Sequence, residues 1–319
     1  MKQVVLGAGP LGKSLAQILA DEGHVVQLLS IMGNPAYDMP GTHPQAIDAT
    51  DVDQMRQVCE GADAVYLCLN AHYVDWYALF PPRLETTLNA VATTGATLIY
   101  HDNLYMYGPV DGPLVEELPN VTTTRKAALR GDMARTVLEA AQSGKIRGVI
   151  GRSADMYGPG ALNSSFNSTL GQRHFYPLLA GKAVSIVGDI DKPHTYTFVD
   201  DVARGLITLA QHDDALGQVW HLPAAPTLSH RELLTIAFEE ASLAPKIRGS
   251  KISGYFLRLI GLFQRDVAEV AEVLYQFEQA LVVSHQKFER RFGASPTPHR
   301  EALRQTLEWY RDNPMPNAG

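Results

Sequence analysis

The sequence is poor in cysteine, in positive charge and in long apolar runs. Only two of its 319 residues are cysteines, Cys59 and Cys68, and both fall in or beside apolar stretches. A disulfide framework or a zinc site is therefore not expected, and a reducing cytoplasm is the expected setting. The formal net charge of −7 gives no electrostatic reason to expect nucleic acid or an anionic membrane surface as a partner.

No apolar run approaches the roughly 18 residues that a membrane-spanning helix needs. The opening segment, MKQVVLGAGPLG, breaks into glycines too early for the apolar core of a signal peptide. What the chain does contain is 45% hydrophobic residues, enough to bury one large domain or two smaller ones that share a core. We therefore expect a soluble, cytoplasmic, globular protein.

Over the first 150 residues, short apolar runs alternate with longer amphipathic segments. The apolar runs predict strands at 4–7, 24–30, 62–70, 96–103 and 147–153. The amphipathic segments predict helices at 11–23, 51–61, 81–95 and 131–144. Strands that alternate with helices in this way are typical of the α/β class. The pattern predicts a Rossmann-type, doubly wound parallel sheet with helices on both faces.

After residue 155 this alternation ends. Strand candidates at 183–189 and near 194 precede a helix that ends at 210, and Ser229 with Glu232 forms a capping box that begins another helix. Further helices are predicted at 265–277 and 299–311. We infer a dinucleotide-binding Rossmann domain of residues 1–155 plus about 195–222. A smaller, mostly helical C-terminal substrate lobe takes about 156–194 plus 223–319.

The segment Gly7-Ala8-Gly9-Pro10-Leu11-Gly12 fits the pattern G-x-G-x-x-G. It follows a predicted strand and begins an amphipathic helix, which is the context that a dinucleotide-binding turn requires. Gly7 permits the tight turn, Gly9 lets a pyrophosphate approach the backbone, and Gly12 lets the helix pack on the strand. The phosphates then lie at a helix N-terminus, where free N–H groups favour negative charge. The alternative is a glycine-rich turn without a ligand.

The second strand bears on the choice between NAD and NADP. It ends in LLSIMGN, without the acidic residue that binds the ribose hydroxyls in NAD-selective sites. It also lacks an arginine that would bind a 2′-phosphate. Ser30 and the backbone around Met32 and Gly33 are the candidates for contacting the ribose. The missing acid favours NADP over NAD.

Several short segments, in their order along the chain, resemble the extended short-chain dehydrogenase/reductase family, also called the NAD-dependent epimerase/dehydratase family. The resemblance covers residues 1 to about 220. It rests on the glycine motif, Asp48-Ala49-Thr50-Asp51, Asn70-Ala71, Tyr107-Gly108, Arg152 through Tyr157-Gly158-Pro159, and Val199-Asp200-Asp201-Val202-Ala203.

The resemblance implies a Rossmann fold with a bound NAD(P) and a substrate lobe built from the later residues. It places Asp48 and Ala49 near the adenine, and Leu69, Asn70 and Ala71 along the middle of the cofactor. It makes Ser153 and Asp155 contacts of the nicotinamide end. Asp155 stands where the family more usually has asparagine. A homodimer through the helices after strands four and five is a further family expectation.

The chain departs from the family at its catalytic motif. The family uses Ser or Thr, Tyr and Lys, with the Tyr and Lys four residues apart at the start of a helix. The matching positions are occupied by Asn103, Thr124 and Ala128. None of the thirteen tyrosines has a lysine four residues later, so the loss does not depend on the alignment. We identify the chain as an atypical member that lacks the Tyr-x-x-x-Lys motif.

Three interpretations of this loss remain open. In the first, Tyr105 is the acid, Asn103 orients a carbonyl, and Lys126 or Arg125 supplies positive charge; alternatively Tyr105 is a packed aromatic and Lys126 a solvated lysine. In the second, a substrate is polarised by Asn103, Thr124 or water, without the roughly 10²–10⁴-fold help of a general acid. In the third, the chain is a non-catalytic NADP-binding sensor or regulatory protein, because a fold alone does not settle function.

His194 precedes the Val199 segment and either faces the cofactor cleft or has a structural role. No metal-ligand spacing stands out, and the pair His72 and Asp75 lacks further ligands. The sequence therefore predicts an NAD(P)-dependent oxidoreductase or epimerase-like enzyme acting on a small carbonyl or hydroxyl compound. The sensor is the alternative function.

Overall fold

A computed structural model describes the chain except for residues 32–38, 162–169, 251–267, 270 and 316–319. Its centre is a seven-stranded sheet in the order β11-β6-β5-β4-β1-β2-β3, with every neighbouring pair parallel. The strands are β1 (Lys2–Leu6), β2 (Val25–Ser30), β3 (Thr42–Ala46), β4 (Ala64–Leu67), β5 (Thr97–Asp102), β6 (Arg147–Arg152) and β11 (Val219–His221).

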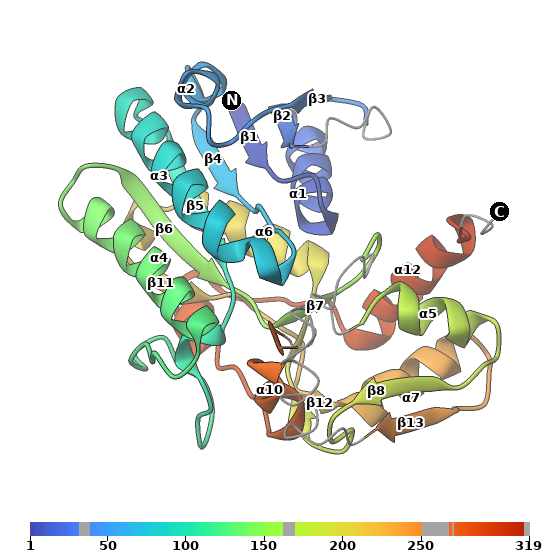
Figure 1. Cartoon of the computed structure of the whole chain (residues 1–319). Helices are drawn as coiled ribbons and strands as arrows, with labels where there is room; N and C mark the ends of the chain where they lie inside the picture. The colour runs from blue at the N-terminus through green and yellow to red at the C-terminus, as the bar shows by residue number, and fades with distance from the viewer. Residues whose placement is uncertain (32–38, 162–169, 251–267, 270, 316–319) are drawn as a thin grey trace.

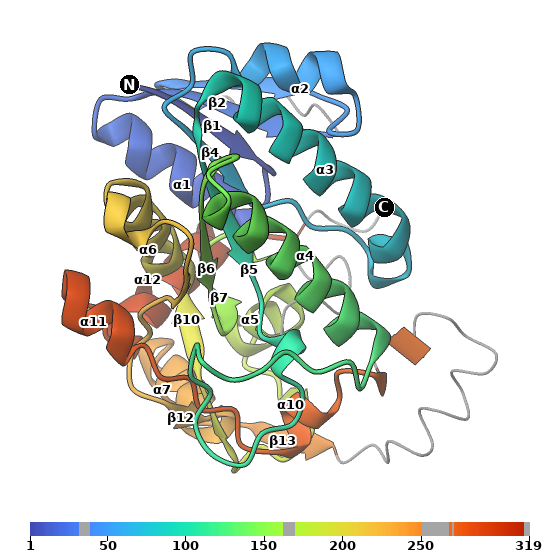
Figure 2. The same cartoon turned by 90° about the vertical axis from the view of Figure 1, so that its left-hand side faces the viewer.

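Helices cover both faces of this sheet (Figures 1 and 2). On one face lie α1 (Pro10–Asp21) and α6 (Val199–Ala210); on the other lie α2 (Val52–Cys59), α3 (Trp76–Thr94) and α4 (Arg125–Gln142). Side chains alternate along each strand, so Val5 packs in the core under α1 and α6, whereas Val4 packs in the core under α2, α3 and α4. The predicted doubly wound parallel sheet is confirmed.

The second lobe lies beyond the C-terminal ends of the strands (Figure 1). Its described helices include α5 (Gln172–Leu179), α7 (His230–Glu240), α10 (Tyr275–Glu278) and α12 (His299–Asp312). The helix α11 (Gln286–Phe292) packs instead against β11 at the edge of the large sheet. Three small ladders join β7 (Asp155–Tyr157) to β10 (Tyr196–Phe198), β9 (Pro193–His194) to β12 (Leu228–Ser229), and β8 (Val184–Val187) to β13 (Ile247–Ser250). Short 3-10 turns are η2 (Tyr73–Asp75), η3 (Tyr105–Tyr107) and η4 (Asp213–Ala215).

Two predicted helix starts were wrong. The helix predicted from residue 81 begins at Trp76, so that Pro81 and Pro82 lie inside it. The helix predicted from residue 131 begins at Arg125, because the hydroxyl of Thr124 accepts a hydrogen bond from the Ala127 N–H at 3.1 Å. The capping box is confirmed. The Ser229 N–H donates to Glu232 at 2.7 Å, and the Glu232 N–H donates to the Ser229 hydroxyl at 3.2 Å. Of the helix predicted at 265–277, residues 265–267 and 270 lie outside the described residues; the described part is interrupted by a turn at 272–274, after which α10 begins.

Candidate active site

The glycine-rich turn between β1 and α1 has room at only one of its three glycines. Gly7 has φ +116°, and a Cβ there would lie 2.7 Å from the Cys68 carbonyl oxygen. A Cβ on Gly12 would lie 1.7 Å from the Gly7 carbonyl oxygen. A Cβ on Gly9 would have no atom within 4 Å. The turn is thus packed on its protein side and open at Gly9, which fits a dinucleotide pyrophosphate held at the N-terminus of α1.

The turn forms one wall of a cavity of about 330 Å³. The chain builds the sheet outward from β1 to β3, then crosses back to β4, so the cavity lies where the strand order reverses. Open α/β sheets bind ligands at such a switch point, beyond the carboxyl ends of the strands. The other walls come from the ends of β4, β5 and β6, from β7, and from α3, α4 and residues near α10.

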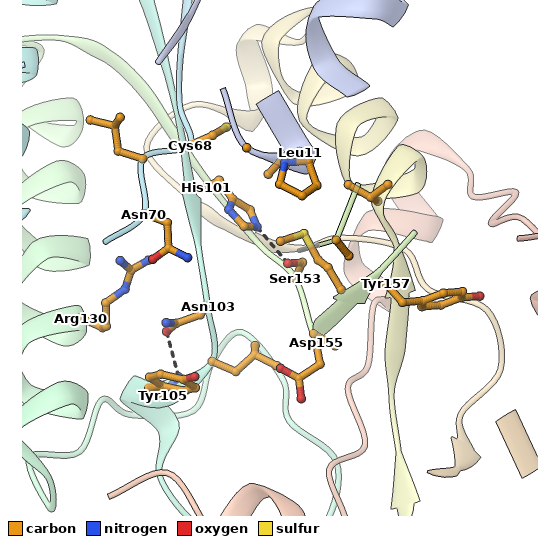
Figure 3. A pocket seen from close by; sticks show the side chains of 18 of the residues that line it. Leu11, Cys68, Asn70, His101, Asn103, Tyr105, Arg130, Ser153, Asp155 and Tyr157 are labelled. Carbon is orange, nitrogen blue, oxygen red and sulfur yellow. Dashed lines mark hydrogen bonds between the residues drawn. The ribbon is translucent and has the colours of Figure 1, made fainter. Parts of the chain in front are cut away.

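Eight of the predicted cofactor-binding residues line this cavity. They are Gly9, Pro10, Leu11, Gly12, Leu69, Asn70, Ser153 and Asp155. Of the predicted catalytic residues, Asn103 and Tyr105 line it as well. Figure 3 shows Arg130 and Asn70 on the wall near α4, and Asp155 and Tyr157 on the opposite wall at β7.

Asn103 and Tyr105 follow directly after β5. The Tyr105 N–H donates to Asn103 Oδ1 at 3.1 Å, which identifies the amide oxygen and leaves the amide N–H groups as donors. The hydroxyls of Tyr105 and Tyr73 are 2.6 Å apart, and Tyr73 also lines the cavity. Burial, and after it the charges of Tyr73 and Asp155, raises the pKa of Tyr105 well above its ordinary value. Tyr105 is therefore a protonated phenol at neutral pH.

His101 and Ser153 form a second polar pair, at the ends of the adjacent strands β5 and β6. His101 Nε2 lies 2.9 Å from Ser153 Oγ, and both residues line the cavity. Burial, followed by the positive charge of Arg130, lowers the pKa of His101 to about 4. The imidazole is therefore neutral at physiological pH.

A buried ion network supports the wall near α4. Asp102 is completely buried and accepts from Arg130 Nε at 2.8 Å and Nη2 at 2.5 Å, and from Arg152 Nε at 3.2 Å. The network continues from Arg152 Nη1 to the Tyr107 hydroxyl at 2.7 Å, which lies 2.7 Å from His221 Nε2. Of these residues, Arg130 lines the cavity. The network holds a guanidinium at the cavity wall on a rigid support.

Two predicted catalytic residues lie outside the cavity lining. The Thr124 hydroxyl caps α4, as described above. Lys126 is completely buried, and its ammonium is bonded to Glu269 and lies 3.7 Å from Glu272. The same ammonium lies 4.8 Å from the centre of the Tyr73 ring, so one aromatic ring separates it from the cavity. Arg125 is largely exposed and lies over the Tyr77 ring.

The residues predicted for the adenine and its ribose lie at the ends of β2 and β3, and Ala71, predicted for the middle of the cofactor, follows β4. Ser30 is the last residue of β2, and Ala49 is fully buried. Asp48 accepts from the N–H and hydroxyl of Thr50, and these hydrogen bonds lower its pKa. The Ala71 carbonyl accepts from the Trp76 indole at 3.0 Å. Met32 and Gly33 lie outside the described residues.

Among the cavity-lining residues that sequence reasoning missed are Tyr73, Trp76, His101, Arg130 and Gln276. One signal was available for His101, because it is a polar residue near the end of a predicted apolar strand. Another was available for Arg130, which follows Lys126 by four residues near the position expected for the missing Tyr-x-x-x-Lys motif. The others come from segments whose approach to the sheet no local pattern indicates.

Within the described ranges, no group of three or more His, Cys, Asp or Glu side chains is arranged to hold a metal ion. Cys59 and Cys68 are both free thiols. No described helix is long and apolar enough to cross a membrane.

Comparison with solved structures shows the same fold over nearly the whole chain. A dTDP-glucose 4,6-dehydratase from Streptomyces venezuelae, with NAD bound, matches at 18% identity and a TM-score of 0.77, covering 98% of this chain and 97% of that one. A UDP-glucose 4-epimerase from Thermotoga maritima matches at 16% identity and a TM-score of 0.80, covering 98% and 99%. The enzyme of the same name from Thermus thermophilus, in complex with NAD, matches at 18% and 0.78, covering 98% and 99%.

No curated protein sequence gives a significant match. The sequence profile of the NAD dependent epimerase/dehydratase family, however, matches residues 4–222, which contain the sheet, the glycine-rich turn and most of the residues that line the cavity. The chain therefore belongs to the NAD dependent epimerase/dehydratase family.

Proposed function

We propose that the protein is a nicotinamide-dinucleotide-dependent oxidoreductase or epimerase-like enzyme that acts on a small carbonyl or hydroxyl compound. One observation carries the proposal. A single cavity contains the open glycine turn and, at the end of β5, the hydrogen-bond donors of Asn103 and Tyr105. The NAD-bound neighbours support a nicotinamide cofactor.

The turn at Gly9 and the N-terminus of α1 would hold the pyrophosphate, and Asn70, Ser153 and Arg130 would contact the rest of the cofactor. When bound, the nicotinamide supplies or accepts a hydride. Arg130 brings positive charge to the wall from which the family's lysine is missing, and Asp102 fixes its direction. Because β2 ends at Ser30 and is followed by Ile31, with no carboxylate at either position, we propose NADP as the preferred cofactor over NAD.

Asn103 and Tyr105 would act on the substrate oxygen. The Asn103 amide donates a hydrogen bond that polarises a carbonyl, and Tyr105 donates the proton that the oxygen takes up on reduction. Because its pKa is raised, the Tyr105 phenol keeps its proton at neutral pH. The proton is therefore present for a developing alkoxide, although the phenol is a weaker acid than an ordinary tyrosine, and no phenolate is present to act as a base for an alcohol. The site therefore favours carbonyl reduction at neutral pH, and alcohol oxidation requires alkaline conditions.

The test is oxidation of NADPH during incubation with a panel of aldehydes, ketones and quinones. Sustained turnover that falls at least about tenfold in Tyr105→Phe supports the proposal. Tyr77→Phe is the matched control, because it removes a phenol hydroxyl from α3, a helix of the cavity wall, while Tyr77 itself does not line the cavity. Tight cofactor binding without turnover over the whole panel would instead favour the non-catalytic sensor.

A further inference from the structure

Asp155 is the only acidic side chain among the described residues that line the cavity. It begins β7, and 22% of its side chain is exposed. Figure 3 shows it at the end of the cavity away from Leu11 and the glycine-rich turn. Its negative charge contributes to the raised pKa of both Tyr73 and Tyr105, so the carboxylate lies within electrostatic reach of the two phenols.

His194 forms a hydrogen bond with this carboxylate. Its Nε2 lies 2.8 Å from Asp155 Oδ2, and the histidine is 1% exposed. Its Nδ1 is buried and has no hydrogen-bond partner among the described residues. A carboxylate only accepts hydrogen bonds, so the Nε2–H of His194 is the donor to Asp155. His194 therefore fixes the position of the Asp155 carboxylate.

The ring of His194 is fixed by its neighbours. It stacks on Phe277 with 5.9 Å between ring centres, and its centre lies 4.6 Å from that of His230. Burial lowers the pKa of His230 to about 3, so this imidazole is neutral at physiological pH. The Nε2–H group of His194 that donates to Asp155 is therefore held in a fixed orientation.

The polar groups at this end of the cavity are complementary in kind. Asn103 and Tyr105 donate hydrogen bonds, whereas a carboxylate only accepts them and has room for several. The lining of the cavity also includes the aromatic rings of Tyr73 and Tyr157, and such apolar surroundings strengthen the attraction of a carboxylate for a donor. A substrate that matches both sides has a carbonyl oxygen and, beside it, a group that donates a hydrogen bond.

We propose that Asp155, positioned by His194, selects carbonyl substrates with a hydroxyl or protonated amino group beside the carbonyl and rejects substrates with a carboxylate or phosphate there. That these compounds are substrates rests on the proposed function. The binding preference rests on the cavity alone. Asp155 is a specificity-determining residue in this account, and His194 is a positioning residue.

The test uses three ketones of similar size that differ in charge: aminoacetone, hydroxyacetone and pyruvate. Their binding to the protein loaded with NADP⁺ is measured by ligand-observed NMR, which needs no turnover. We expect both donor-bearing ketones to bind about tenfold or more tightly than pyruvate. In Asp155→Asn, aminoacetone should lose about tenfold and pyruvate should gain. Asp213→Asn, at a side chain that is 82% exposed on the surface, is the matched control and should leave the order unchanged.

His194 is tested by two substitutions. His194→Phe removes the donor and should weaken the preference, whereas His194→Gln keeps a donor and should restore most of it. If Asp155→Asn leaves the order of the three ketones unchanged, the inference is wrong even when turnover with other carbonyls supports the proposed function. If the order holds but no carbonyl is turned over, the proposed function fails and the binding preference stands. A uniform fall in kcat in Asp155→Asn, with KM unchanged, would make Asp155 a catalytic group and overturn its role in specificity.

Discussion

Valine substitutions at Gly9 and Gly12 should have opposite effects on binding and on folding. Gly9 has φ −74° and ψ −175°, an extended conformation that valine adopts readily, and its Cβ would meet no atom within 4 Å. Gly9→Val should therefore change the free energy of unfolding by no more than about 1 kcal/mol. The added side chain would occupy the space of the pyrophosphate. Loss of two charge-assisted hydrogen bonds of about 1.5–3 kcal/mol each lowers dinucleotide affinity about 10²–10⁴-fold.

Gly12→Val should instead destabilise the fold. Its Cβ would lie 1.7 Å from the Gly7 carbonyl oxygen, whereas Cβ contacts in proteins stay above 3.0 Å. Because the obstacle is backbone, α1 must move away from β1, at a cost of about 1–3 kcal/mol or more. Urea unfolding measures the stability of both variants, and calorimetry measures NADPH binding. A folded Gly9→Val variant that binds NADPH as tightly as the wild type would refute the assignment of the turn as a pyrophosphate site.

The remaining predictions concern the cavity wall and acid stability. Tyr105→Phe should lower kcat at least about tenfold in steady-state assays, and an unchanged kcat would mean that Tyr105 only packs. Asp102→Ala leaves the buried Arg130 and Arg152 without their shared carboxylate, so urea unfolding should show a loss of about 3–5 kcal/mol; a loss below about 1 kcal/mol would contradict the network. His101 and His221 have pKa values lowered to about 4 and about 3 by burial. Below about pH 6.5 the unfolded chain, whose histidine pKa values are about 6.5, binds more protons than the folded chain. The stability that each buried neutral histidine contributes is therefore complete above about pH 6.5 and is lost as the pH falls toward about 4. At pH 5 each histidine should cost about 2 kcal/mol of stability; urea midpoints that do not change between pH 7 and pH 5 would contradict this.

The strands of the sheet interior could be predicted from the sequence because they are buried on both faces and read as apolar runs. The third strand could not be delimited, because in β3 only Thr42 is buried and the other four residues are exposed. The start of α4 was placed too late because its first turns carry Lys126 and Arg130, which look like surface residues. Both are buried, and the partners of Lys126 at Glu269 and Glu272 lie more than a hundred residues along the chain.

The candidate site likewise contains some residues that the sequence predicts and others that it does not. The glycine turn is a local motif, so its residues could be named in advance. Asn103 and Tyr105 were predicted from the resemblance to the family, which puts the catalytic Ser or Thr at Asn103 and the rest of the triad nearby. The pairs Tyr73–Tyr105, His101–Ser153 and Asp155–His194 join segments that are 32, 52 and 39 residues apart. Such pairs depend on how the strands and loops meet, which spacing along the sequence does not encode.

The central claim is that the glycine-rich turn binds a nicotinamide dinucleotide. Titration of the wild-type protein with NADPH and with NADH, by calorimetry, tests it most directly. Quenching of tryptophan fluorescence provides a second signal, because Trp76 lines the cavity. The account predicts saturable binding, tighter for NADPH than for NADH. Binding of neither cofactor would mean that the glycines only shape a turn, and the proposed enzyme would be contradicted with it.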